Sequence, residues 1–347
     1  MKVLLTGGCG YIGTHICWEL LSRQCDVIVV DNLSNSNTHG IRRVSKHFDH
    51  YVNILAFDLQ NEVALDKVFK ENKIDAVIHL AGLKSVGESV SQPLKYYQNN
   101  LLSTMILLKV MEKHNVTDLI FSGSATVYKD SLKAHDESDE VKPINPYGKT
   151  KLMIEVILQD HFKGSPLDWR MTSLRYFNPI GAHPSGLIGE NPTGVPANLV
   201  PYIVKVIAGE YNELKIFGDD YDQSKDGTCV RDYIHVVDLA EGHVNALENL
   251  RLRKKQFQIF NLGTGNGYSV LDVIKTFESL GLNVPYTIVE RRPGDDPVCF
   301  ANPSKANLEL KWKTKYTLED MCRDSWNWWN KKNDYSNTDN DDGWTIV

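Results

Sequence analysis

Short apolar runs alternate with amphipathic stretches along the first half of the chain. The runs are rich in Val, Ile and Leu, which is typical of strands that are buried on both faces of a parallel sheet. Because strands that alternate with helices favour right-handed crossovers, we predict an α/β fold with a doubly wound parallel sheet. The predicted strands are Lys2–Thr6, Asp26–Val30, Asn53–Phe57, Ala76–Leu80, Asp118–Ser122 and Met171–Tyr176, and the predicted helices are Tyr11–Ser22, Glu62–Asn72, Pro93–His114 and Gly148–Phe162.

The pattern changes after Tyr176. Residues 178–198 are rich in Pro and Gly, which indicates loops, and residues 218–228 form a second polar and acidic stretch. We therefore expect a smaller, mixed α/β unit that binds substrate beside the sheet. We assign 1–177 and about 231–265 to the larger unit, about 178–230 and 266–330 to the smaller one, and 331–347 to a flexible tail rich in Asn, Asp, Lys and Ser.

Composition argues against several classes of partner. The chain has 347 residues and a formal charge of −6, and a mildly acidic chain repels nucleic acids and anionic membranes on average. No apolar run approaches the ~18 residues of a membrane span. The chain turns to glycine too early for a secretory signal, and its six cysteines show no C-x-x-C pair or zinc-type spacing. We therefore expect a cytoplasmic protein with free thiols and no metal, nucleic-acid or membrane partner.

A glycine-rich turn follows the first predicted strand. Gly7, Gly10 and Gly13 lie between that strand and an amphipathic helix, where they allow a tight turn and a close approach to a pyrophosphate. Asp31 ends the second strand, 18 residues beyond Gly13. Its carboxylate suits an adenosine ribose and repels a 2′-phosphate, although a turn or cap residue is the alternative. The combination predicts a Rossmann-type domain that binds NAD rather than NADP.

A candidate acid–base pair lies at the start of a predicted helix. Tyr147 and Lys151 are four residues apart, a spacing that places both on one face. A nearby ammonium lowers the pKa of a phenol, so the pair can exchange a proton with a substrate hydroxyl. Ser124 follows the fifth strand, whose carboxyl end faces the cofactor crevice. Taken singly, Y-x-x-x-K would indicate an exposed helix start and Ser124 a cap. Together the three residues predict an acid–base site.

Longer motifs resemble one family along nearly the whole chain, to about Asn330. They read GGCGYIG, DNLSNS, LAGLKSVGES, SGSATVY, YGKTK, RYFNPIGAHPSG, NLVPYI, VRDYIHVVDLA, FNLGTGNGYSV and RRPGDDPVC. In combination they resemble the extended short-chain dehydrogenase/reductases, and in particular the UDP-galactose (UDP-glucose) 4-epimerases. The resemblance implies NAD-dependent interconversion of two UDP-hexoses through a 4-keto sugar. It also implies a homodimer that pairs through two helices, at roughly Pro93–His114 and Gly148–Phe162.

The resemblance implies roles for individual residues. Tyr147 is the general base and acid, Lys151 tunes it and holds the nicotinamide ribose, and Ser124 orients the sugar. The implied NAD contacts, the three glycines included, are Gly7, Gly10, Tyr11, Ile12, Gly13, Asp31, Asn32, Asn35, Ser36, Asp58, Leu59, Ala81, Gly82, Lys84, Asn99, Tyr147, Lys151 and Phe177. The implied contacts to the UDP-hexose are Ser124, Asn178, Asn198, Leu199, Phe217, Arg231, Arg292, Asp295 and Cys299.

Two positions depart from the family pattern. Gly123 stands where many members have serine, at a position that is not catalytic. Cys299 stands where the family often has tyrosine at the wall of the sugar pocket, and a thiol leaves more volume than a phenol. We therefore weigh two interpretations of Cys299, namely room for an N-acetylated UDP-sugar and a neutral packing substitution.

Three alternative functions share the predicted fold. A nucleotide-sugar 4,6-dehydratase needs an Asp-Glu pair after the Ser124 position, where this chain has Ala125 and Thr126. A ketoreductase would use the same Ser–Tyr–Lys set but would release its cofactor in each cycle. A protein that only senses NAD would have the fold without the chemistry, and it would not need Tyr147 or Lys151.

Overall fold

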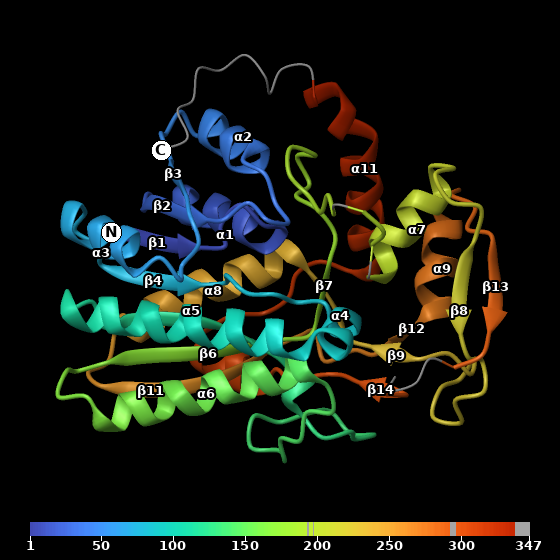
Figure 1. Cartoon of the computed structure of the whole chain (residues 1–347). Coiled ribbons are helices and arrows are strands. Elements are labelled where there is room, and N and C mark those ends of the chain that lie inside the picture. Colours follow the sequence, from blue (N-terminus) through green and yellow to red (C-terminus); the bar gives the residue numbers. More distant parts are fainter. Residues whose placement is uncertain (193, 197, 292–295, 337–347) are drawn as a thin grey trace.

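A seven-stranded parallel sheet forms the centre of the larger unit (Figure 1). The computed structural model describes residues 1–192, 194–196, 198–291 and 296–336. The sheet strands are β1 (Lys2–Thr6), β2 (Asp26–Asp31), β3 (Asn53–Ala56), β4 (Ala76–His79), β5 (Asp118–Ser124), β6 (Arg170–Tyr176) and β11 (Gln256–Leu262). They lie in the order β11-β6-β5-β4-β1-β2-β3, with every neighbouring pair parallel. The order reverses between β1 and β4, so the predicted doubly wound, Rossmann-type sheet is confirmed.

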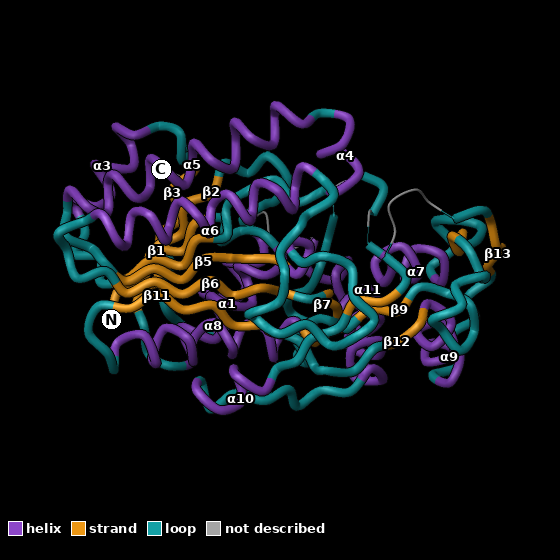
Figure 2. The backbone as a smooth tube through the Cα atoms, turned by 90° about the horizontal axis from the view of Figure 1, so that it is seen from below, coloured by secondary structure: helices purple, strands orange, loops and turns teal. Residues whose placement is uncertain are grey.

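Helices cover both faces of this sheet (Figure 2). They are α1 (Tyr11–Ser22), α2 (His39–His47), α3 (Glu62–Glu71), α4 (Val86–Ser91), α5 (Pro93–Lys113), α6 (Pro146–Gly164) and α8 (Val236–Arg251). Val3 and Leu5 of β1 are buried in one apolar cluster with residues of α1 and α8, whereas Leu4 is buried in a second cluster with residues of α5 and α6. Successive side chains of a strand point to opposite faces, so the continuous apolar runs supply the core on both sides.

Where the structure describes it, the smaller unit combines short paired strands with three helices. The helices are α7 (Leu199–Ile207), α9 (Val270–Ser279) and α11 (Leu318–Ser336). Ile203, Phe277 and Met321 of these helices share a third apolar core. The strands pair as β7 (Asn178–Ile180) with β10 (Tyr233–His235), β8 (Leu214–Phe217) with β13 (Tyr286–Val289), and β9 (Val230–Arg231) with β12 (Tyr268–Ser269) and β14 (Val298–Cys299). From β10 the chain returns to the large sheet through α8 and β11, and α10 (Ser304–Glu309) packs on β11.

Several helices of the described residues differ from the sequence prediction, and α11 and α2 show why. α11 continues to Ser336, so a flexible tail that begins at residue 331 is wrong, and residues 337–347 lie outside the described part of the chain. The buried Trp328 anchors the middle of α11, and tertiary packing of this kind outweighs a polar composition. α2 was not predicted, because its basic sequence HGIRRVSKH buries little more than Ile41 and Val44.

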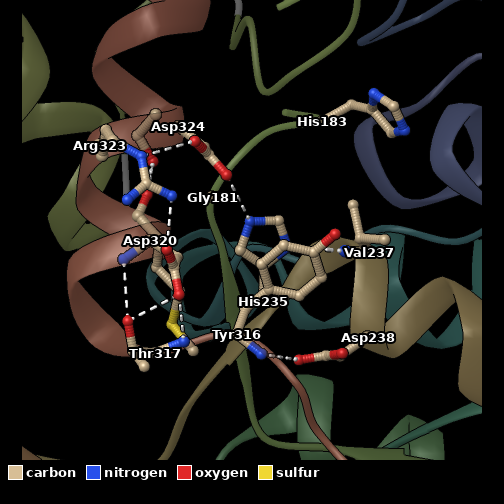
Figure 3. A network of polar contacts seen from close by, with 12 residues as sticks. Gly181, His183, His235, Val237, Asp238, Tyr316, Thr317, Asp320, Arg323 and Asp324 are labelled. Atoms are coloured by element: carbon tan, nitrogen blue, oxygen red, sulfur yellow. Dashed lines mark hydrogen bonds and ion pairs between the residues drawn. The ribbon is translucent and has the colours of Figure 1, made fainter. Parts of the chain in front are cut away.

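A network of polar contacts fastens α11 to the start of α8 (Figure 3). His235 accepts a hydrogen bond from the Val237 N–H at 3.1 Å and so caps α8. The Nε2 atom of His235 lies 3.4 Å from the carboxylate of Asp324 on α11. The Tyr316 ring stacks on the His235 imidazole with centroids 4.1 Å apart, and the Tyr316 N–H donates to Asp238 at 3.2 Å. Because His235 and Asp324 are both buried, the network holds the smaller unit against the larger one.

Candidate active site

A cleft with about 1070 Å³ of empty space opens at the carboxyl ends of the parallel strands. Its walls come from the turns after β1, β2, β3 and β4, from the ends of β5 and β6, and from α5 and α6. The strand order reverses here, and ligands of open α/β sheets bind at such a reversal. The predicted cofactor residues that line the cleft are Gly7, Gly10, Tyr11, Ile12, Gly13, Asp31, Asn32, Asn35, Asp58, Leu59, Ala81, Gly82, Lys84, Asn99, Tyr147 and Lys151.

The glycine turn packs closely against neighbouring backbone atoms at the N-terminus of α1. Gly7 has a φ of +70°, and a Cβ atom there would lie 2.7 Å from the Ala81 nitrogen. A Cβ atom on Gly13 would lie 2.6 Å from the Gly7 oxygen. No side chain caps the helix at Gly10, so the first N–H groups of α1 are available to an anion in the cleft. This turn fits the pyrophosphate of a dinucleotide.

Asp31 ties the glycine turn to the loop that follows β2. Its carboxylate accepts hydrogen bonds from the Cys9 N–H at 3.0 Å, the Leu33 N–H at 2.9 Å and the Ser36 hydroxyl at 2.9 Å. Asp31 therefore acts as a turn residue and also lines the cleft. An acidic group at this end of β2 suits a ribose with free hydroxyls and disfavours a 2′-phosphate. The residues in this part of the cleft fit NAD.

The start of α6 places Tyr147 and Lys151 in successive turns. Asn145 caps the helix by accepting a hydrogen bond from the Gly148 N–H at 2.8 Å, and Pro146 occupies the first turn. The Lys151 ammonium donates to the carbonyl and hydroxyl oxygens of Ser122, at 2.7 and 3.0 Å. It also lies 5.9 Å from the centre of the Tyr147 ring. The predicted pair therefore shares one face and one cleft.

Burial dominates the protonation of this pair. It lowers the pKa of Lys151 to about 7, with Glu155 opposing the shift. Burial also raises the pKa of Tyr147 above its ordinary value, and a hydrogen bond from Ser124 acts in the opposite direction. The predicted lowering of the Tyr147 pKa by Lys151 is therefore wrong for this structure, because desolvation of the phenol is the larger effect and the opposing effect comes from Ser124. Ser124 therefore acts on the Tyr147 phenol in this structure.

A buried ion pair behind the cleft leaves little space for a side chain at Gly123. Glu155, one turn after Lys151, accepts hydrogen bonds from Arg175 at 3.1 and 2.7 Å and from Ser173 at 2.8 Å. A Cβ atom on Gly123 would lie 2.7 Å from the Ser173 hydroxyl and 3.2 Å from the Glu155 carboxylate. A side chain at position 123 would therefore have to displace Ser173 or Glu155.

Ser36 and Phe177, also predicted as cofactor contacts, lie behind the wall of the cleft. Ser36 bonds Asp31 from the adjoining loop. Phe177 is buried in an apolar cluster with Ala125 and Ala301, and Cys299 packs against the same cluster. Through this cluster the predicted wall of the sugar pocket adjoins the turn that follows Ser124, the last residue of β5.

Two predicted substrate residues, Arg231 and Cys299, lie side by side on paired strands β9 and β14. Asp232 holds the segment in place, because its buried carboxylate accepts hydrogen bonds from the N–H groups of Thr264 and Ala301, at 2.8 and 3.1 Å. The remaining substrate residues come from separate elements: Asn178 begins β7, Asn198 and Leu199 begin α7, and Phe217 ends β8. Arg292 and Asp295 lie outside the described residues.

Sequence comparison places the chain in a family. The model of the "NAD dependent epimerase/dehydratase family" matches residues 3–263. This chain belongs to the NAD-dependent epimerase/dehydratase family. A UDP-glucose 4-epimerase of Bacillus subtilis is 52% identical over 330 residues, which span 94% of this chain and 96% of that protein. UDP-glucose 4-epimerase 2 of Arabidopsis thaliana is 50% identical over 333 residues, covering 94% of each chain.

Solved structures of family members have the same fold. The UDP-glucose 4-epimerase of Bifidobacterium longum in complex with NAD⁺ and UDP superposes with a TM-score of 0.92 at 50% identity, covering 96% of this chain and 99% of that one. The UDP-Glc/GlcNAc 4-epimerase of Campylobacter jejuni gives a TM-score of 0.81 at 34% identity, with 95% and 99% covered. NAD is the cofactor of this family.

The turn after β5 helps to distinguish an epimerase from a dehydratase, the two activities in the family's name. It forms a short 3₁₀ helix, η1 (Ala125–Val127), and the Thr126 hydroxyl lies 2.8 Å from that of Ser124. The dehydratase alternative was predicted to need an Asp-Glu pair at this place, and the turn has the methyl group of Ala125 and the hydroxyl of Thr126 instead. The site therefore suits epimerisation better than dehydration.

The structure adds residues that the sequence did not identify. Ser122 and Tyr176 line the cleft beside Lys151. Glu190 lies 3.5 Å from the Lys84 ammonium and 3.4 Å from the Asn198 amide, so it joins a predicted cofactor residue to a predicted substrate residue. Tyr176 ends a parallel strand, and that position was the available signal for it. Glu190 lies in a loop, and no pattern in the sequence indicated its role.

In the described residues, no helix is long and apolar enough to cross a membrane. Nor does this part of the chain bring three or more His, Cys, Asp or Glu side chains together in a way that could hold a metal ion. All six cysteines are free thiols.

Proposed function

We propose that this protein interconverts UDP-galactose and UDP-glucose with tightly held NAD. The observation that carries the proposal is the meeting of Ser124, Tyr147 and Lys151 beside the cleft that the glycine turn also lines. Relatives at 52% and 50% identity that are named UDP-glucose 4-epimerase support the choice of substrate. NAD bound in the cleft would accept a hydride from carbon 4 of the sugar and return it.

The acid–base residues move one proton in each direction. Tyr147 takes the proton of the 4-hydroxyl as the hydride leaves, and it returns the proton when the hydride reaches the opposite face of the 4-keto sugar. The Lys151 ammonium favours the phenolate that this step needs. Ser124 donates a hydrogen bond toward the same oxygen and so orients the hydroxyl. No proton or electron is gained or lost overall, as an isomerase requires.

The smaller unit holds the UDP-hexose in this proposal. α7 begins at Leu199 with no side-chain hydrogen bond from Asn198, so its first N–H groups suit a pyrophosphate. Arg231 adds a guanidinium fork, which binds phosphate oxygens in a bidentate manner. Arg292 and Asp295 remain predicted contacts.

The test is turnover of UDP-galactose by the purified protein with no added cofactor. We expect net formation of UDP-glucose, because an epimerase retains its NAD and reoxidises it in each cycle. A requirement for added reduced cofactor would favour a ketoreductase instead. Tyr147→Phe should keep its NAD and lose most of its activity, and near-normal turnover by that variant would contradict the role of Tyr147.

A second substrate pair follows from Cys299. Its side chain packs against the cluster that contains Phe177, and a thiol there leaves room that a phenol would fill. A Campylobacter jejuni neighbour at 34% identity is named a UDP-Glc/GlcNAc 4-epimerase. We expect turnover of UDP-N-acetylglucosamine by the wild type and loss of it in Cys299→Tyr, with the simple sugars still turned over. No acetylated product from the wild type would favour the neutral-packing interpretation.

We also propose a homodimer that pairs through α5 and α6. The two helices lie side by side (Figure 1). Met105, Met153 and Val156 on them are 45%, 42% and 49% exposed, and such an apolar stripe marks an interaction surface. Light scattering after gel filtration should give twice the chain mass for the wild type and a monomer for Val156→Glu. Val63→Glu on α3, at a residue 82% exposed, is the matched control that should stay dimeric.

A cytoplasmic location is the last part of the proposal. Its support is that Cys9, Cys17, Cys25 and Cys322 are buried as free thiols, a state that a reducing compartment preserves. Cell fractionation should find the protein with cytoplasmic markers, and recovery with a secreted or membrane fraction would contradict it.

A further inference from the structure

A chain of hydrogen bonds leads from Lys151 away from the cleft and into the sheet. The Lys151 ammonium donates to the Ser122 hydroxyl oxygen at 3.0 Å. The Ser122 and Tyr176 side chains line the same part of the cleft, and the Ser122 hydroxyl acts on the Tyr176 phenol as a donor that opposes the rise of its pKa by burial. The Tyr176 hydroxyl in turn bonds Nε2 of His243. Nδ1 of His243 lies 2.8 Å from the carbonyl oxygen of Leu239, one turn earlier on α8.

The direction of these bonds is fixed from the far end. The Leu239 carbonyl can only accept, so Nδ1 of His243 carries a proton and donates it. Burial lowers the pKa of His243 to about 4, so at neutral pH the ring carries one proton and its Nε2 has a lone pair. The Tyr176 hydroxyl must therefore donate to Nε2. Its oxygen is left to accept from Ser122.

The same logic fixes the near end. An ammonium only donates, so the Ser122 oxygen accepts from Lys151 while its own proton points to Tyr176. The hydroxyls of Ser122 and Tyr176 and the His243 N–H thus all point away from the buried Lys151 ammonium. The negative end of each of these dipoles faces the ammonium. Hydrogen bonds aligned in one direction polarise one another and strengthen the first.

Few other groups face Lys151 from the elements packed around it. On α6 these are Tyr147 and Glu155, and Glu155 is already bonded to Arg175 of β6. On β4 His79 faces it, with its ring nitrogens 2.8 and 2.9 Å from the hydroxyls of Thr6 and Thr104. Burial lowers the pKa of His79 to about 3, so it is neutral. The Ser122 oxygens are therefore the direct acceptors of the ammonium among the described residues.

We propose that Tyr176 and His243 are positioning residues for the acid–base pair, which lock the Ser122 hydroxyl as an acceptor and so keep Lys151 protonated beside Tyr147. The inference rests on the proposed function, because it assumes that Tyr147 and Lys151 carry the proton transfer. The same lock makes Tyr176 a hydrogen-bond donor to His243. Tyr176 therefore does not compete with Tyr147 as a base, although both phenols line the cleft.

The test is the pH dependence of kcat for the NAD-loaded Tyr176→Phe variant. The Lys151 ammonium is present below its pKa and lost above it, so a lower pKa removes the active form at a lower pH. We expect the alkaline limb to move down by about one pH unit, the size that loss of part of one charge-assisted hydrogen bond produces. His243→Asn should move the limb in the same direction; if it does not fold, Tyr176→Phe decides alone.

Tyr128→Phe is the matched control. Tyr128 is a buried tyrosine whose hydroxyl donates to the Asn261 side chain at 2.6 Å, outside the chain from Lys151. Its loss should lower the melting temperature about as much as Tyr176→Phe but leave the alkaline limb in place. A Tyr176→Phe profile that matches the wild type would overturn the inference while Tyr147→Phe stays inactive. Activity in Tyr147→Phe would instead overturn the proposed function itself.

Discussion

The glycine turn gives a graded prediction, because its three glycines meet very different surroundings. A Cβ atom on Gly13 would lie 2.6 Å from both the Gly7 oxygen and the Gly8 Cα, against 3.4 Å for ordinary contact, so α1 must retreat by about 0.8 Å. A Cβ atom on Gly10 would meet the Gly7 oxygen at 3.3 Å, almost ordinary contact. Backbone atoms cannot rotate away as a flexible side chain does, so in Gly13→Ala the strain moves the helix.

That displacement should act on the cofactor. The N–H groups at the start of α1 would move out of hydrogen-bond geometry with the pyrophosphate, and a shift near 1 Å at such a site costs up to about 10²-fold. We expect purified Gly13→Ala to contain little NAD, and its affinity, measured by calorimetry on stripped protein, to fall by about 10- to 100-fold. Gly10→Ala should keep most of its NAD. A Gly13→Ala protein with full NAD content, or equal losses in both variants, would refute the reasoning.

Two further predictions concern the core behind the cleft. Glu155→Gln leaves the buried Arg175 without its anion and should lower the free energy of unfolding by about 3 kcal/mol in urea titrations, whereas Glu140→Gln at an exposed pair should cost less than about 1 kcal/mol. A cost below 1 kcal/mol at Glu155 would contradict the buried-pair argument. Gly123→Ala should destabilise by about 1–3 kcal/mol through its contact with Ser173, and adding Ser173→Ala should recover part of that loss in the same titration. No recovery would show that the clash lies elsewhere.

The large sheet was predictable because its signals are local. Apolar runs such as Lys2–Thr6 must be buried on both faces, and the carboxyl ends of parallel strands meet at one edge, so Gly7, Asp31 and Ser124 could be assigned to one crevice from spacing alone. All six predicted strands are present, with ends that shift by at most two residues.

What the sequence did not predict depends on residues that are distant along the chain. The pKa of Tyr147 rises because burial outweighs the opposing effect of Ser124, and no spacing rule measures burial. Gly123 is explained by Ser173 across β5 and β6, and the middle of α11 is fixed by the buried Trp328. Tyr176 and His243 meet only because β6 and α8 pack together.

The most direct test of the central claim follows the hydrogen on carbon 4. UDP-galactose labelled with deuterium at carbon 4 is incubated with the purified protein in ordinary water without added cofactor, and the UDP-glucose formed is analysed by NMR. The proposed mechanism predicts that the label stays at carbon 4 with its configuration inverted, because the hydride returns from the bound NAD to the same carbon. Replacement of the label by solvent hydrogen would contradict it.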